Sequence, residues 1–285
     1  MNLSSLTPAS RAVLHACCCQ CGSAALAELQ AALAAGGDAN VRDPGEEQHT
    51  ALIYAAVKDG CAPVIRCLLE HGADAAAQDA LGCTALHYAA VRLQVEGARL
   101  LLAHGASPNM ANHSGDTPLH LAMRFIRHHS FAELRPMLQL LLRHGGDVNA
   151  CSPAGGSLLH CAVRRCEDPA ELAPALRFLL AAGGDVNVAD PTGCTPLHAA
   201  AGVGNMAAAQ LFLRHGAEVD ARAADGRTPL MHAASSQSVL MVAMLLLHGA
   251  DVRVRDAAGR TAADHAAACH ASADMLHMLT PRGGS

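Results

Sequence analysis

The apolar residues of this chain recur in two short phrases that alternate along almost its whole length. The first phrase occurs as GCTALHYAA, GDTPLHLAM, GGSLLHCAV, GCTPLHAAA and GRTPLMHAA at residues 82–90, 115–123, 155–163, 193–201 and 226–234. The second occurs as LLEHGAD, LLAHGAS, LLRHGGD, LLAAGGD, FLRHGAE and LLLHGAD at residues 68–74, 101–107, 141–147, 179–185, 212–218 and 245–251. Self-similarity of this kind indicates a repeat architecture.

Each repeat unit is predicted to be a helix, a short turn, a second helix and a loop. The Thr of the first phrase can accept hydrogen bonds from free backbone N–H groups as an N-cap. The Pro after it occupies the first helical position, where its missing N–H removes no bond. The Ala-Ala pair lets a neighbouring helix approach closely, and the Gly of the second phrase ends the second helix. The motif leucines, at steps of 34, 33, 40, 38 and 33 residues, are Leu52, Leu86, Leu119, Leu159, Leu197 and Leu230.

This pattern resembles the ankyrin repeat over roughly residues 10–280. We expect one array over 1–285, with repeats at about 10–41, 42–77, 78–110, 111–150, 151–188, 189–221 and 222–254 and a C-terminal cap at 255–280. The first repeat carries AVLH (12–15) in place of the motif, and the last signature, GRTAADHAA (259–267), is weakened. Terminal repeats are expected to differ because they face water on one side.

The resemblance implies an α-helical repeat solenoid of paired antiparallel helices with projecting β-hairpin loops. It also implies a non-enzymatic module that binds protein partners on a concave surface, as a scaffold, an inhibitor or a substrate-recruiting adaptor. By match to the family, the motif histidines bond to their own Thr and to backbone of a neighbouring repeat; these are His87, His120, His160 and His198, with His15 grouped among them. A second set lies near the C-terminus of the second helix, where it suits the helix dipole: His71, His104, His144, His215 and His248.

Two repeats are longer than the others. From motif Leu to the closing Gly the interval is 26 residues in the fourth repeat and 24 in the fifth, against 19 in three others. The stretches 130–146 and 168–184 align without gaps, and each has a Pro, Pro136 or Pro174, six residues after its cap. We expect a kink or a restarted helix at each Pro. The added length is either tolerated loop growth or an enlarged wall that contacts a partner.

Basic side chains cluster near the ends of the first helices in the second to fifth repeats. We call this set the basic stripe: Lys58, Arg92, Arg124, Arg127, His128, His129, Arg164 and Arg165. Such a stripe can attract an acidic or phosphorylated segment, with Arg forming bidentate bonds. The alternative is an ordinary solvated helix end. We hypothesise that the basic stripe is the principal binding surface.

Four of the twelve cysteines lie in LHACCCQCG, residues 14–22. The repeat register places Cys17 and Cys18 on the buried Ala-Ala pair and leaves Cys19 and Cys21 near the helix end as candidate redox thiols. No second CxxC accompanies the one formed by Cys18 and Cys21, so no metal site is predicted. The alternative function is a thiol- or metal-responsive regulatory protein.

Two hairpin asparagines, Asn149 and Asn187, have a Leu eight residues ahead, as targets of asparaginyl hydroxylation in this family usually do. The simpler interpretation is a turn Asn that tolerates a left-handed conformation. No Gly-rich phosphate loop and no nucleophile elbow occurs, so we predict no catalytic residues and no cofactor.

Composition narrows the partners further. The chain is 51% hydrophobic but 2% aromatic, and its formal net charge is −5. These values favour closely packed helices and argue against nucleic-acid binding. No apolar run is long enough for a membrane span, and the N-terminus lacks a signal-peptide pattern. We expect an intracellular, cytoplasmic protein, with the nucleus as an open alternative, that is monomeric by itself and binds no small-molecule substrate.

Overall fold

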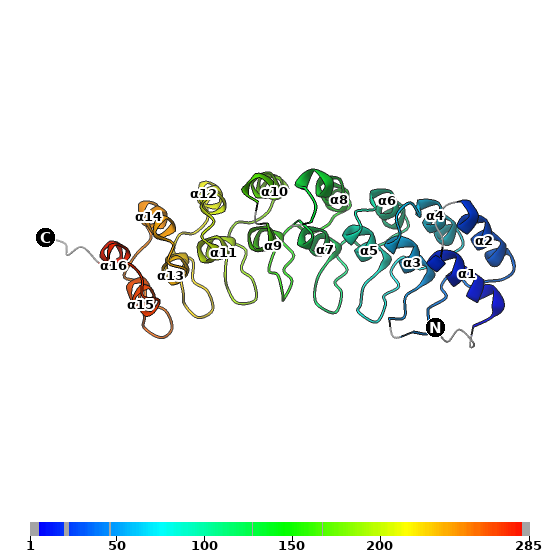
Figure 1. Cartoon of the computed structure of the whole chain (residues 1–285), viewed down its shortest axis with the longest axis horizontal. Helices are drawn as coiled ribbons and strands as arrows, with labels where there is room; N and C mark the ends of the chain where they lie inside the picture. Colours follow the sequence, from blue (N-terminus) through cyan, green and yellow to red (C-terminus); the bar gives the residue numbers. More distant parts are fainter. Residues whose placement is uncertain (1–5, 20–22, 46, 127, 167, 281–285) are drawn as a thin grey trace. The chain divides into compact units, whose positions relative to one another are not determined.

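The computed structural model describes residues 6–19, 23–45, 47–126, 128–166 and 168–280. Those residues form sixteen helices and no strand, arranged as eight helix pairs (Figure 1). The first helices of the pairs are α1 (Pro8–Cys19), α3 (Ala51–Val57), α5 (Ala85–Val91), α7 (Pro118–Arg124), α9 (Leu158–Arg165), α11 (Pro196–Val203), α13 (Pro229–Ser235) and α15 (Ala262–Ala268). The second helices are α2 (Ser23–Ala34), α4 (Ala62–Glu70), α6 (Val95–Ala103), α8 (Phe131–Arg143), α10 (Pro169–Ala181), α12 (Met206–Arg214), α14 (Val239–Leu247) and α16 (Ala273–Leu279). The predicted fold class, a helical repeat solenoid, is confirmed.

The chain divides into two compact units, Met1–Asp147 and Val148–Ser285. The first unit contains α1–α8 and the second α9–α16. Inside each unit the first helices pack on one another in chain order, and each also packs on the second helix of its own pair. The single continuous array expected from the sequence stays a prediction.

The loops between pairs fold as short hairpins, which we call finger loops. Each closes with a backbone hydrogen bond, for example from Asp79 N to Cys83 O at 2.9 Å and from Asp190 N to Cys194 O at 2.8 Å. Adjacent fingers are also joined, as Ala224 N donates to Thr192 O at 2.9 Å. Neighbouring fingers within a unit are therefore fixed relative to one another.

Within each unit, the repeated leucines and alanines build the core between the first helices and the second helices. Leu86, Leu119, Leu197 and Leu230 are fully buried, and the alanines that follow them are buried as well. The motif hydroxyl residue stands at the N-cap of each first helix from α3 to α15. The sequence phrase thus specifies both the start of the helix and its buried face.

The first pair departs from the predicted register at its start. Helix α1 begins at Pro8, and Thr7 accepts a hydrogen bond from Ser10 N at 3.1 Å, so the capping residue precedes the AVLH stretch. His15 therefore lies inside the helix, is exposed and contacts Glu28 Oε1 through Nδ1 at 2.9 Å. The grouping of His15 with the buried motif histidines is wrong, because no hydroxyl cap stands three residues before it.

In each long repeat, four of the extra residues lengthen the second helix. Helices α8 and α10 have 13 residues each, whereas α4, α6, α12 and α14 have 9. Pro136 and Pro174 lie inside continuous helices, so neither helix restarts at its Pro. Each stands nine residues before the closing Gly, as does Pro63, the second residue of α4. These four residues therefore form an extra turn placed before the usual helix start.

Candidate functional site

The motif histidines join consecutive helix pairs. His87, His160 and His198 are fully buried, and each Nδ1 lies 2.9 Å from the hydroxyl oxygen of the capping Thr or Ser. Each Nε2–H donates to a carbonyl oxygen before the next first helix, at 3.2 Å for Asp116, 2.9 Å for Cys194 and 3.1 Å for Arg227. Burial lowers the pKa of all three imidazoles, to about 4 for His160. The predicted bonding of these histidines is confirmed. Each ring is neutral and has a structural role.

The histidines of the second phrase are C-cap residues, as predicted. In four of them Nδ1–H donates to the carbonyl four residues earlier, at 2.8 Å in His71, His215 and His248 and 2.9 Å in His104. This bond satisfies one carbonyl that the end of the helix would leave free.

Four asparagines form a bridge between pairs that the sequence reasoning missed. Asn187 Nδ2 donates to Gly216 O at 3.1 Å, and Asn187 Oδ1 accepts from Glu218 N at 2.9 Å. Asn40, Asn109 and Asn149 make the same two bonds with the following pair. None of the four has a positive φ, so the expected left-handed turn is wrong. The regular place of each Asn, four residues after the closing Gly, was the available signal.

Hydroxylation of Asn149 and Asn187 stays a prediction. Both amide groups are held by two backbone partners, Asn149 by Gly183 O at 3.1 Å and Asp185 N at 2.8 Å. An enzyme that modifies either side chain therefore meets it in one fixed orientation.

In the first unit, the basic stripe falls into groups with different neighbours. Arg124 contacts the buried carboxylate of Asp116 at 2.5 Å, which ties α7 to the finger before it. Arg92 contacts Asp59 at 3.1 Å, and both side chains are exposed. Lys58 donates to the backbone carbonyl of Cys18. His128 is exposed, His129 lies 3.4 Å from Glu133 Oε2, and Arg127 lies outside the described residues.

In the second unit, two adjacent arginines of α9 differ in their neighbours: one has a buried carboxylate partner and the other has none among the described residues. Arg164 contacts Asp190 Oδ2 at 2.9 Å. Burial would raise the pKa of Asp190, but hydrogen bonds from Thr192 and Arg164 outweigh it and lower the pKa to about 2. Arg165 is half-buried and forms no ion pair or hydrogen bond with the described residues. The assignment of the basic stripe as a binding surface stays a prediction.

The first helices also present variable side chains beside the stripe. In the first unit the residue four after the cap is Tyr54, Tyr88 or Leu121. Tyr54 donates to Asp43 at 2.5 Å and Tyr88 to Asp79 at 2.7 Å, while the His49 ring stands edge-on between the two tyrosines at 5.2 and 5.3 Å. Burial raises the pKa of both phenols.

The equivalent positions in the second unit carry other side chains. Ala199, at the same place in α11, is buried, whereas Gly202 and Val203 near the end of that helix are exposed. On α13 the place is taken by His232, whose ring lies 5.2 Å from His198, and burial lowers its pKa to about 4. The two units thus present different chemistry on the same repeated frame.

Burial keeps two of the described thiols of the first two pairs protonated. Cys17, Cys61 and Cys67 are buried, Cys18 is half-buried, and burial raises the pKa of Cys17 and Cys67. A protonated thiol is a poor nucleophile and a poor metal ligand. No group of three or more His, Cys, Asp or Glu residues is placed to hold a metal ion within the described residues.

The two candidate redox thiols are those of Cys19 and Cys21. The side chain of Cys19 and all of Cys21 lie outside the described residues. A thiol- or metal-responsive role for them stays a prediction, which zinc analysis of the purified protein would test. Across the described ranges, every helix is too short or too polar to cross a bilayer.

A family model described as ankyrin repeats (three copies) matches residues 14–112, 82–134, 129–223, 169–256 and 224–284. The chain belongs to the ankyrin-repeat family. Ankyrin repeats are generally non-enzymatic modules for protein–protein interaction.

Individual proteins match the chain over shorter stretches. An ankyrin repeat protein of Acanthamoeba polyphaga mimivirus is 39% identical over 79 residues, which is 28% of this chain and 19% of that protein. An intracellular phospholipase A2 of Caenorhabditis elegans is 33% identical over 92 residues, 30% of this chain and 9% of the enzyme. The chain thus spans less than 20% of the length of these relatives.

Among solved structures, the ankyrin repeat domain of Bcl-3, a member of the IkappaB family, is similar with a TM-score of 0.66 and 28% identity. The alignment covers 82% of this chain and 99% of that domain. This likeness extends the family assignment from sequence to fold.

Proposed function

We propose that this ankyrin protein is a non-enzymatic binding module that holds protein partners on the face that the first helices and finger loops form within each unit. The observation that supports this proposal is that each repeat combines constant buried positions with a variable position. The cap, Leu, His and Ala positions are fixed by burial and hydrogen bonds, whereas the residue four after the cap changes from Tyr54 and Tyr88 to Leu121 and His232, all of which are partly exposed. A constant frame with variable surface side chains suits selective protein binding.

The motif chemistry supports a binding role over an enzymatic one. The His, Thr and Ser residues that resemble catalytic groups are buried and bonded to each other or to backbone. Such groups cannot reach a substrate in the folded chain. Scaffold, inhibitor and adaptor are all compatible with this face. The buried free thiols fit a reducing compartment, so we place the protein in the cytoplasm or nucleus.

Within each unit, we assign partner contact to the members of the basic stripe whose charge is still accessible. In the first unit this is Arg92, whose partner Asp59 is exposed, and in the second unit it is Arg165. Arg124 and Arg164 instead form ion pairs with the buried carboxylates of Asp116 and Asp190 in the finger loops, so we assign them a structural role. The partner segment is therefore acidic or phosphorylated, because Arg binds such groups in bidentate fashion.

The test is affinity capture by the full chain followed by matched charge reversals. Captured proteins identified with the wild-type chain are re-measured with Arg92→Glu and Arg165→Glu. We expect binding to weaken at least about tenfold with thermal melting unchanged. Arg143→Glu, an exposed arginine at the end of a second helix, is the matched control. Capture that survives both stripe reversals would refute the assignment.

A further inference from the structure

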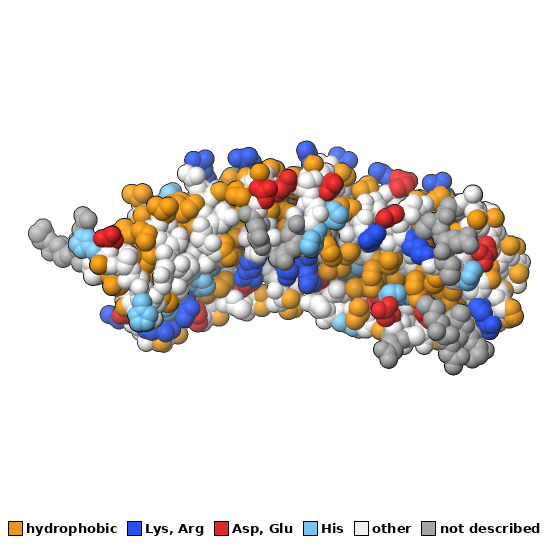
Figure 2. All heavy atoms as spheres, in the orientation of Figure 1, with side chains coloured by type: hydrophobic (Ala, Val, Ile, Leu, Met, Phe, Trp, Pro, Cys, Tyr) orange, Lys and Arg blue, Asp and Glu red, His pale blue; other side chains and the backbone are white. Residues whose placement is uncertain are grey.

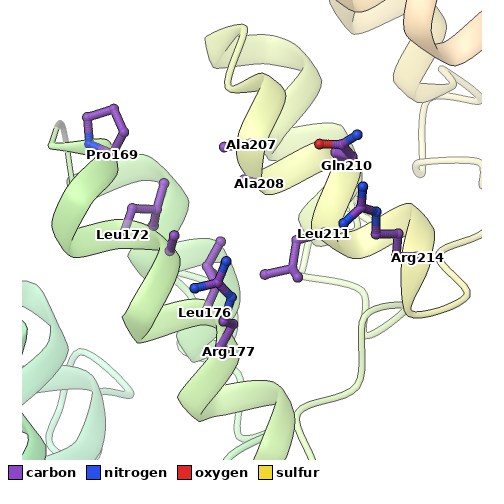
Figure 3. Close-up of a pocket in the computed structure, with 10 residues that line it drawn as sticks. Pro169, Leu172, Leu176, Arg177, Ala207, Ala208, Gln210, Leu211 and Arg214 are labelled. Carbon is purple, nitrogen blue, oxygen red and sulfur yellow. The ribbon is translucent and has the colours of Figure 1, made fainter.

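A groove lies between the second helices of two consecutive pairs in the second unit, away from the first-helix face. Leu172 and Leu176 of α10 form one wall, and Leu211 of α12 points toward them from the other (Figure 3). Its volume is about 130 Å³. The lining at the start of α12 is supplied by Ala207 and Ala208, whose single methyl groups leave space that larger side chains would fill.

Helix length explains why the groove forms here. Helix α10 has 13 residues and α12 has 9, so the extra turn of α10 stands beside the start of the shorter helix. Leu172, in this extended part, is buried, whereas Leu211 is only half-buried and Ala207 is exposed. The groove therefore offers an apolar floor that water still reaches.

Two arginines stand at the same end of this groove. Arg177 lies beside Leu176 and Arg214 beside Leu211, one on each side (Figure 3). Both are exposed, and neither has an ion pair or a hydrogen bond to the residues described. Other arginines of the second unit are matched to carboxylates: Arg164, Arg253 and Arg260. Figure 2 shows basic side chains along the edge over α10 and α12 with apolar atoms between them.

We propose that this groove binds a short segment of a partner protein in which one large apolar side chain is followed closely by acidic residues. The apolar side chain fills the space over Ala207, and the carboxylates lie between Arg177 and Arg214. Two like charges that flank an apolar groove without counter-charges are complementary to such a segment, because each guanidinium can form a bidentate bond with a carboxylate.

The size of the groove decides against a small-molecule ligand. Pockets for such ligands typically enclose roughly 300–1,000 Å³, well above the volume here. That volume suits an anchoring side chain instead, as in interfaces where a buried residue supplies most of the binding energy. Single-stranded nucleic acid would require aromatic side chains for base stacking, and the groove is lined by none.

The test selects peptides that bind the full wild-type chain from a phage library that displays short random peptides. Peptides that also bind the Ala207→Leu variant are removed by counter-selection. This substitution fills the groove without altering charge, and Ala207 is exposed, so folding is preserved. We expect the peptides retained only by the wild-type chain to share a large apolar residue with Asp or Glu within four positions. Absence of groove-dependent peptides, or enrichment of basic ones, would overturn the proposal.

Charge reversal then tests the arginines with the selected peptides. Arg177→Glu combined with Arg214→Glu should weaken binding at least about tenfold, measured by fluorescence polarisation, while Arg143→Glu on α8 changes nothing. Peptide variants with Lys in place of the acidic residues should bind the doubly reversed chain better than the wild type. Equal binding of the acidic peptides by the wild-type and doubly reversed chains contradicts the proposal. The stripe variants Arg92→Glu and Arg165→Glu leave this groove intact, so it is tested independently of the first-helix face.

Discussion

His160 of α9 donates its Nε2–H to the carbonyl oxygen of Cys194, 2.9 Å away in the finger loop before α11. The other ring nitrogen lies 2.9 Å from the Ser157 hydroxyl oxygen. One buried, neutral imidazole therefore caps its own helix and holds the next repeat in place. Both roles require the ring to stay unprotonated at Nδ1, which couples the stability of the repeat stack to pH.

We expect the free energy of unfolding to fall as the pH is lowered from 7 to 5. The unfolded chain takes up protons near pH 6.5, whereas folded His160 has a pKa lowered to about 4 by burial. Between these values the unfolded state binds more protons, so acid favours unfolding. At about 1.4 kcal/mol per pH unit, His160 alone accounts for ~2 kcal/mol at pH 5.

Urea unfolding at the two pH values measures this loss. Asp190, with a pKa lowered to about 2, does not contribute in this window, because its stabilisation is lost only as the pH falls below the unfolded value of 3.8. A urea midpoint that is the same at pH 7 and pH 5 would show that these histidines are protonated in the folded chain.

The asparagine bridge predicts a stabilising substitution. Ala76 occupies the bridging place in the second pair, and its N–H bonds to Asp74 Oδ1 at 2.9 Å, as the N–H of Asn187 bonds to Asp185 Oδ1 at 2.8 Å. Ala76→Asn should bond to Gly105 O and add about 0.5–1 kcal/mol. Asn187→Ala is the reciprocal change and should lose about 1–2 kcal/mol. Both are read from urea midpoints, and a destabilised Ala76→Asn chain would count against the bridge.

Finger spacing can be tested with two glycines of similar backbone conformation. Gly193 has φ 77° and Gly216 has φ 85°. A Cβ on Gly193 would lie 2.5 Å from Ala224 N, whereas one on Gly216 would meet nothing within 4 Å. Gly216→Ala should cost about 1–2 kcal/mol from backbone strain alone. Gly193→Ala should cost more, because the neighbouring finger has to move; equal melting temperatures would show that the fingers are loosely held.

The neighbouring arginines of α9 should separate a structural from a surface role. Arg164→Gln removes the partner of the Asp190 carboxylate and should cost about 1 kcal/mol, since the pair is partly exposed. It should also raise the pKa of Asp190, which carboxyl NMR titration detects. Arg165→Gln should change stability by under about 0.5 kcal/mol. Equal effects of the two substitutions would mean that the contact with Asp190 contributes nothing.

The helix pairs could be predicted from the sequence, because the cap, Leu and Ala positions repeat and each of them has one physical explanation. The prediction failed at the first pair because a terminal helix is not constrained by a preceding repeat, so α1 could start at Pro8. The pairing of Arg164 with Asp190 was also out of reach, because 26 residues separate them and only the stacked repeats bring them together. The groove beside Ala207 depends on unequal lengths of adjacent helices, which no single repeat encodes.

The extra turns at the starts of α8 and α10 identify a place where the chain tolerates insertion. Length was added there twice, yet the Asn109 and Asn149 bridges to the following glycines keep the same geometry as in the shorter repeats. The same place in a shorter pair, before Asn205 at the start of α12, should accept a fluorescent label or a small reporter domain. The protein could then be followed in cells with both its first-helix face and its finger loops unaltered.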